Sequence, residues 1–272
     1  MKSNLKLRII SAGVYLIVLA SAFFINEYVF LPIFSIIMII CLSEYYELTK
    51  KIGANPNKIF SIIYSEIIFI LSYLYSKNLI NQTMIIMVIL GLAFIILATE
   101  LIRNGNSFKN LSAEFFGILY ITIPFSITNF IVFYNGKFDY SILLGVFVII
   151  WAYDIFAYFI GSSIGKRKIA PTISPNKTIE GTIGGITLSV LASVAVFYVL
   201  KTLELKDWAI ISLFVSIGAF IGDLIESKLK RSAGVKDSGN IMPGHGGLLD
   251  RFDSFLFASV GAALYLMFIK II

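Results

Sequence analysis

Residues 227–253 read SKLKRSAGVKDSGNIMPGHGGLLDRFD, a polar stretch between apolar runs at 208–226 and 254–272. The stretch holds several lysines, arginines and aspartates and the only histidine of the chain, His245. Glycines and Pro243 are placed between these charges, so we expect the backbone to turn here and not to continue as one helix. A charged, glycine-rich segment between two helices of membrane length predicts a site that binds phosphates at the membrane surface.

The composition of the whole chain indicates an integral membrane protein. Of the 272 residues, 58% are hydrophobic and 14% are charged, and the mean hydropathy is +0.90, far outside the range of soluble domains. The net charge of +6 lies between apolar segments, so it forms no solvated basic face and predicts no nucleic-acid partner. Cys41 is the only cysteine, which excludes an intrachain disulfide and a cysteine zinc cluster.

Apolar runs long enough to cross about 30 Å of hydrocarbon recur along the sequence. We therefore predict an all-α, polytopic integral membrane protein with about nine transmembrane helices. The predicted spans are residues 9–25, 28–43, 59–76, 82–102, 115–134, 140–161, 182–200, 208–226 and 254–272. Residues 44–51 are expected to prolong the second helix, and residues 103–114 to form a loop. We divide the chain into residues 1–136, with five helices, and residues 137–272, with four helices and the predicted site.

The distribution of lysine and arginine predicts a cytosolic N-terminus. In that orientation 17 of the 22 basic residues lie in cytosolic segments and the other five on the opposite side, a strong positive-inside bias. Without the nine basic residues of the loops at 162–181 and 227–253 the ratio is still eight to five. Both loops then face the cytosol, where nucleotides are. Residues 20–22 (ASA) imitate a signal-peptide cleavage site, but the apolar run continues beyond them, so we expect an uncleaved first helix.

Carboxylates inside the predicted spans are a second feature of the sequence. An ionised carboxylate in a membrane helix costs roughly 3 kcal/mol, so Asp154 and Asp223 are expected to face protein, water or a cation. Glu226 lies on nearly the same face as Asp223, or at a helix end that rises into the headgroup region. Asp250, at the entry to the ninth helix, is a candidate partner for Asp223. Two carboxylates in a low dielectric repel unless one is protonated or a cation lies between them, and Mg²⁺ suits oxygen ligands and nucleotide phosphates.

The loop before the seventh helix contains the sequence SPNKTIEG at residues 174–181. The proline restricts Ser174 to an extended conformation. We then expect the seventh helix to open with Lys177, Thr178, Glu180 and Gly181, where free backbone N–H groups attract phosphate. A topogenic or headgroup-binding patch explains the basic run at 166–168 at least as well as a catalytic role does.

Three further residues have local interpretations. Gly218 and Gly222 lie four residues apart, which predicts that another helix backbone comes close to the eighth helix. His245 contacts phosphate or orients a carboxylate, or else it is a structural histidine in a glycine-rich turn. Because the chain has no other histidine, a histidine-based metal site is not expected.

The order of these residues resembles the signature of the phosphatidate cytidylyltransferases, also called CDP-diacylglycerol synthases. The matching positions are Ser227, Lys230, Arg231, Lys236, Asp237, Pro243, His245, Gly246, Gly247, Asp250, Arg251 and Asp253. The resemblance covers roughly residues 150–254, whereas the first five helices match only in being apolar. It implies a Mg²⁺-dependent reaction of CTP with phosphatidic acid that gives CDP-diacylglycerol and pyrophosphate. It also implies a homodimer. With the orientation derived above, we expect the protein in the inner membrane of the cell with its active site facing the cytoplasm.

The resemblance also implies roles for individual residues. Asp223 and Asp250 are the implied ligands of Mg²⁺, or of two cations. Lys230, Arg231 and His245 are the implied catalytic groups beside them. The implied contacts to the nucleotide and its phosphates are Ser174, Lys177, Thr178, Ser227, Lys236, Asp237 and Arg251.

Two alternative classes of protein share part of this pattern. A polyprenol or dolichol kinase, or a cytidylyltransferase for ether lipids, would use CTP at a similar glycine- and aspartate-rich site. These motifs do not specify the apolar walls that select the lipid. An ion-coupled transporter would use Asp154 and Asp223 to relay protons or bind cations. A transporter predicts polar residues across the whole membrane, whereas the outer halves of these helices are almost entirely apolar.

Overall fold

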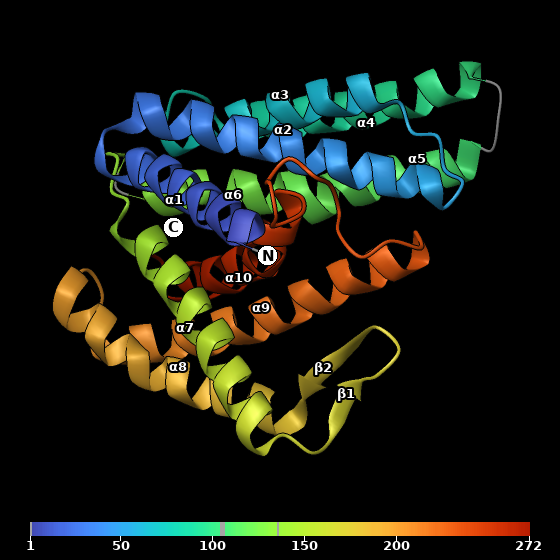
Figure 1. The fold of residues 1–272 in the computed structure, drawn as a ribbon. Helices are drawn as coiled ribbons and strands as arrows, with labels where there is room; N and C mark the ends of the chain where they lie inside the picture. Colours follow the sequence, from blue (N-terminus) through green and yellow to red (C-terminus); the bar gives the residue numbers. More distant parts are fainter. Residues whose placement is uncertain (1, 104–106, 135) are drawn as a thin grey trace. The chain divides into compact units, whose positions relative to one another are not determined.

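A computed structural model of the chain describes residues 2–103, 107–134 and 136–272. Within these residues, nine helical segments are long and apolar enough to cross a membrane, which confirms the predicted polytopic all-α fold (Figure 1). The segments are Leu7–Phe24, Glu27–Lys51, Lys58–Ser76, Gln82–Ile102, Phe108–Val132, Ser141–Ile164, Ile179–Leu200, Leu205–Ser232 and Leu249–Phe268.

The helix ends differ from the predicted spans mainly in the polar segments. Helix α2 (Glu27–Lys51) continues through residues 44–51, as expected. Helix α5 (Ser107–Gly117) begins inside the predicted loop at 103–114, of which residues 104–106 lie outside the described part. Helix α9 (Leu205–Ser232) and helix α10 (Leu249–Phe268) both extend into the polar stretch. The predicted end of the eighth helix at residue 226 was wrong, because Glu226 and Lys230 form an i,i+4 ion pair that favours a further helical turn.

Residues 1–138 and 232–252 form one compact unit, called the first unit below. Its elements are α1 (Lys2–Phe24), α2, α3 (Lys58–Ser76), α4 (Gln82–Ile102), α5, a π-helical turn η1 (Ile118–Thr122) and α6 (Ile123–Val132). Aromatic side chains of α2 form its core: Phe30 and Phe34 stack with ring centroids 4.3 Å apart. Phe125 of α6 contacts the ring of Phe252 at 5.6 Å, which anchors the end of the polar stretch in this core.

Residues 139–231 and 253–272 form the second unit. It contains α7 (Ser141–Ile164), the antiparallel strands β1 (Lys168–Ala170) and β2 (Ser174–Thr178), α8 (Ile179–Leu200), α9 and most of α10. Figure 1 shows the strands as a hairpin that joins one end of α7 to α8. These units group residues by packing, and the predicted division at residues 136 and 137 stays a prediction.

Glycines permit close helix packing in the second unit. A Cβ at Gly185 of α8 would lie 2.8 Å from the Cβ of Ala157 in α7. A Cβ at Gly218 of α9 would lie 2.6 Å from the backbone oxygen of Phe257 in α10. These approaches leave no room for a side chain, and the second confirms the close backbone predicted from the spacing of Gly218 and Gly222.

Candidate functional site

The second unit contains a cavity of about 640 Å³, lined by α7, the hairpin, the start of α8 and α9. Its lining contains two carboxylates, Asp154 and Asp223, and two lysines, Lys168 and Lys177. Its other lining residues are Tyr153, Ala157, Tyr158, Gly161, Ser162, Gly165, Ser174, Asn176, Thr178, Gly181 and Thr182. The cavity therefore combines cationic donors, hydroxyl groups and carboxylate oxygens within one unit.

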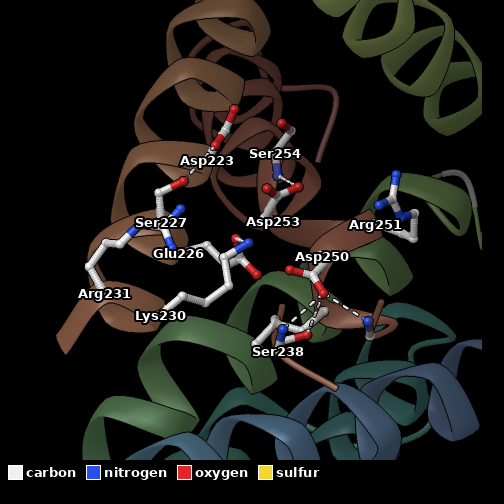
Figure 2. Close-up of polar contacts among 12 residues, drawn as sticks. Asp223, Glu226, Ser227, Lys230, Arg231, Ser238, Asp250, Arg251, Asp253 and Ser254 are labelled. Atoms are coloured by element: carbon white, nitrogen blue, oxygen red, sulfur yellow. Dashed lines mark hydrogen bonds and ion pairs between the residues drawn. The ribbon is translucent and has the colours of Figure 1, made fainter. Parts of the chain in front are cut away.

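Carboxylates from three different helices of the second unit interact with one another. The carboxyl group of Asp253 in α10 lies within electrostatic range of Asp223 in α9 and of Asp154 in α7. The packing of α9 on α10 explains this approach, since a Cβ at Gly222 would overlap the backbone oxygen of Asp253. Figure 2 shows the side chains of Asp223 and Asp253 on these two helices. Across the described residues, no group of three or more His, Cys, Asp or Glu side chains is arranged to hold a metal ion.

Asp154 and Asp253 received no role in the predicted site, although the sequence contained a signal for each. Asp154 was recognised as a carboxylate within a membrane span, and Asp253 belongs to the signature. Their proximity to Asp223 depends on how α7, α9 and α10 pack, which the motif does not encode.

Asp223 is held by two neighbours in the second unit. The Nζ atom of Lys177 lies 2.5 Å from its Oδ2 atom, and the hydroxyl of Ser227 donates to its Oδ1 atom at 3.1 Å. Lys177 also lies over the ring of Phe220, 5.3 Å from the centroid. The structure thus brings together three of the predicted site residues, and Lys177 offsets the charge of Asp223.

The segment SPNKTIEG is a strand followed by a helix. Ser174, Lys177 and Thr178 all lie in β2, and α8 begins at Ile179, so the extended Ser174 is confirmed. The prediction that Lys177 opens the helix was wrong, because Lys177 lies within β2. Thr178 does open the helix as its N-cap, and its Oγ1 atom accepts a hydrogen bond from the N–H of Gly181 at 3.1 Å.

The basic residues at the end of α9 have contacts of their own. Lys230 forms an ion pair with Glu226, whose side chain is fully buried. The Nε atom of Arg231 donates to the backbone oxygen of Ile173 at 3.4 Å. Neither Lys230 nor Arg231 lines the cavity of the second unit, and their implied catalytic roles stay predictions.

Asp250 belongs to the first unit, in the first turn of α10. Its Oδ2 atom accepts hydrogen bonds from the backbone N–H groups of Ser238 at 2.9 Å and Gly247 at 2.7 Å. It also accepts one from the Ser238 hydroxyl at 3.0 Å (Figure 2). Through these bonds Asp250 stabilises the conformation of the polar stretch. The structure describes each unit by itself, so the pairing of Asp250 with Asp223 stays a prediction.

Glu44 of α2 is a residue that the sequence reasoning missed. Its side chain is buried, and it accepts hydrogen bonds from Leu248 N at 3.0 Å, Leu249 N at 2.8 Å and the Ser238 hydroxyl at 3.0 Å. These bonds satisfy free N–H groups at the start of α10. A Cβ at Gly247 would overlap Glu44 and Ser238, so glycine is required there. The available signal was an acidic residue at the end of a membrane span, which was interpreted only as part of a helix extension.

The remaining predicted residues line a second polar pocket, of about 490 Å³, in the first unit. Lys236, Asp237, His245 and Arg251 line it together with Arg8 of α1. The Nη2 atom of Arg251 donates to the backbone oxygen of His245 at 2.8 Å. The predicted site residues therefore belong to two different units.

Comparison with known proteins identifies relatives of the chain. A profile described as the cytidylyltransferase family matches residues 6–269. The phosphatidate cytidylyltransferase of Staphylococcus aureus strain COL is 40% identical over 173 residues, which are 62% of this chain and 64% of the relative. The protein of that name from Bacillus subtilis strain 168 is 44% identical over 161 residues, 58% of this chain and 59% of the relative. The matched region thus spans slightly less than two thirds of these relatives.

Proposed function

Because the chain belongs to the cytidylyltransferase family, we propose that it transfers the cytidylyl group of CTP to phosphatidic acid in phospholipid biosynthesis. The products are CDP-diacylglycerol and pyrophosphate. The name of the relatives supports this activity. The observation that carries the proposal is the cavity of the second unit, where Lys168 and Lys177 face Asp154 and Asp223. Cationic donors and carboxylate oxygens in one cavity suit the phosphates of a nucleotide and a divalent cation.

The reaction requires little covalent help from the protein. The phosphate monoester of phosphatidic acid is largely dianionic near neutral pH, since its second ionisation lies near pH 6. One of its oxygens bonds to the α-phosphorus of CTP, and the bond from that phosphorus to the pyrophosphate oxygen breaks. The barrier is electrostatic, because an anion approaches an anion. Lys177 and the free N–H groups at the start of α8 neutralise and orient the phosphates.

We propose Mg²⁺ as the cofactor, because the carboxylates of the second unit are the donor type that it binds, through one or two carboxylates together with substrate phosphates and waters. Asp154, Asp223 and Asp253 lie within electrostatic range of one another, and a cation would offset their repulsion. Asp223 is the residue of this unit that the signature implies as a ligand of the ion. A bound Mg²⁺ would neutralise charge on the phosphate oxygens. Lys177, which pairs with Asp223, is then a donor to the same phosphates.

We further propose a cytoplasmic N-terminus and a cytoplasm-facing site in the inner membrane of the cell. The positive-inside distribution of lysine and arginine supports this orientation. Contacts within the first unit agree with it, since Ser11 near the start of α1 and Glu44 near the end of α2 both bind the polar stretch. The homodimer rests on the family resemblance. Light scattering of the protein in detergent tests it, and the mass of one chain would refute it.

A turnover assay with purified protein in detergent tests the activity. The protein is incubated with labelled CTP and phosphatidic acid, with and without Mg²⁺, and the lipid products are separated. We expect CDP-lipid and pyrophosphate in equal amounts, and only with Mg²⁺. Product from a polyprenol but not from phosphatidic acid would refute the proposal in favour of a polyprenol kinase.

A further inference from the structure

The polar pocket of the first unit has the charge of an anion-binding site. Three cationic side chains line it, Arg8, Lys236 and Arg251, against the single carboxylate of Asp237. The three cations and one carboxylate leave two net positive charges. The hydrogen bond from Arg251 to the backbone of His245 fixes one of the three cations. Such a lining suits an anion with about two negative charges.

An apolar groove of about 510 Å³ lies in the same unit, between α1 and α2. Ile10, Val14 and Val18 of α1 and Ile36 and Ile40 of α2 form its walls. Val14 is 56% exposed, although it lies in a helix of membrane length. In a bilayer, side chains of this kind contact acyl chains. The groove is therefore suited to a lipid tail.

The groove and the pocket share a boundary. Met242 lines both. Ser11 lines the groove, and its hydroxyl contacts Nδ1 of His245, a pocket residue, at 2.9 Å. The same hydroxyl donates to the backbone oxygen of Pro243 at 3.0 Å. A cationic pocket that adjoins an apolar groove matches a lipid with an anionic headgroup.

We propose that this groove and pocket dock the phosphatidate substrate, with its phosphate among Arg8, Lys236 and Arg251 and an acyl chain against Val14. The inference rests on the proposed function and assigns the phosphatidate to a groove and pocket within the first unit. Charge favours phosphatidate over other phospholipids. A phosphate monoester carries about 1.5 to 2 negative charges at neutral pH, whereas a phosphodiester carries about one. Two net positive charges in the pocket match the monoester.

Paired variants of the full-length protein test the docking site. Arg8→Gln removes one cation of the pocket, and Lys51→Gln removes an exposed cation of α2 that lines neither cavity. Val14→Trp fills the groove, and Ile17→Trp adds the same bulk to an exposed position of α1 outside it, where Ile17 is 70% exposed. The readouts are the KM for phosphatidic acid, the KM for CTP, and direct binding of phosphatidic acid or phosphatidylglycerol without CTP.

We expect Arg8→Gln to raise the KM for phosphatidic acid about tenfold or more, the effect of one lost charged hydrogen bond. Val14→Trp should also raise this KM, because the indole ring occupies the groove. The KM for CTP and the behaviour of the two control variants should not change. Equal KM values for phosphatidic acid in test and control variants would overturn the docking site. Weaker lipid binding with an unchanged KM would also overturn it, because the lipid bound there would not be the substrate.

If the wild-type protein makes no CDP-lipid, the proposed function fails. The binding readout then still tests the pocket: retained preference for phosphatidic acid that Arg8→Gln abolishes supports it, and no preference refutes it.

Discussion

Replacement of Glu44 by alanine tests whether α2 holds the polar stretch in place. In the wild-type protein its carboxylate accepts three hydrogen bonds, from Leu248 N, Leu249 N and the Ser238 hydroxyl. All three donor residues are buried, and Leu249 is 0% exposed. Glu44→Ala therefore leaves buried donors that cannot form replacement hydrogen bonds with water. We expect the free energy of unfolding to fall, and turnover to fall with it because the start of α10 loses its position.

The size of the effect follows from these contacts. A hydrogen bond to a charged group contributes about 1.5 to 3 kcal/mol, and a buried donor without an acceptor costs about 1 to 3 kcal/mol. The Ser238 hydroxyl keeps its second acceptor, Oδ2 of Asp250. Most of the lost stability therefore comes from the backbone N–H groups of Leu248 and Leu249, which lose their acceptor. We expect a destabilisation of about 4 kcal/mol, which lowers the melting temperature by roughly 10 °C in a chain of this size. Glu44→Gln should recover little, since its NH₂ group would face a donor.

The single cysteine provides the assay. Cys41 is buried in α2, so a thiol-reactive dye reports its exposure as the first unit unfolds in detergent. Glu47→Ala is the matched control, because Glu47 lies one turn further along α2 and forms ion pairs with Lys50 and Lys58. Exposed pairs of this kind contribute about 0 to 1 kcal/mol. Equal melting temperatures for Glu44→Ala and Glu47→Ala would refute the reasoning.

Three further substitutions have distinct expected outcomes. Asp223→Asn should abolish Mg²⁺-dependent turnover in the CDP-lipid assay while the yield of monodisperse protein on gel filtration stays as in the wild type. Near-normal turnover would remove this residue from the proposed metal site. Lys230→Ala should lower the free energy of unfolding by about 3 to 5 kcal/mol, because it removes the ion-pair partner of the buried Glu226 carboxylate. The double variant with Glu226→Gln should recover most of this lost stability, measured by thermal unfolding. Gly222→Leu should prevent α9 and α10 from packing and reduce the yield of monodisperse protein on gel filtration. Gly91→Leu should not, because a Cβ at Gly91 would meet no atom of another described segment within 4 Å.

The membrane fold could be predicted from the sequence because the signal is local. Each span is a run of apolar residues whose transfer into hydrocarbon is favourable by itself, whatever the other helices do. The same local reasoning identified Asp154 and Asp223 as candidate functional residues, because a carboxylate within an apolar span has a high free energy of insertion into lipid. It placed helix ends less well, because the pair of Glu226 with Lys230 extends α9 beyond the apolar run.

The site required the tertiary structure because its contacts join residues far apart in the chain. Glu44 and Ser238 are 194 positions apart, and no pattern around residue 44 indicates which donors its carboxylate meets. The approach of Asp253 to Asp223 likewise depends on the glycine at position 222, which lets the backbones of α9 and α10 touch. The sequence by itself determined the polytopic membrane fold and predicted a phosphate-binding site, because hydropathy and charge belong to single residues and short segments. Only the tertiary structure decided which charges meet, because side-chain contacts depend on the packing of helices that the chain connects over long distances.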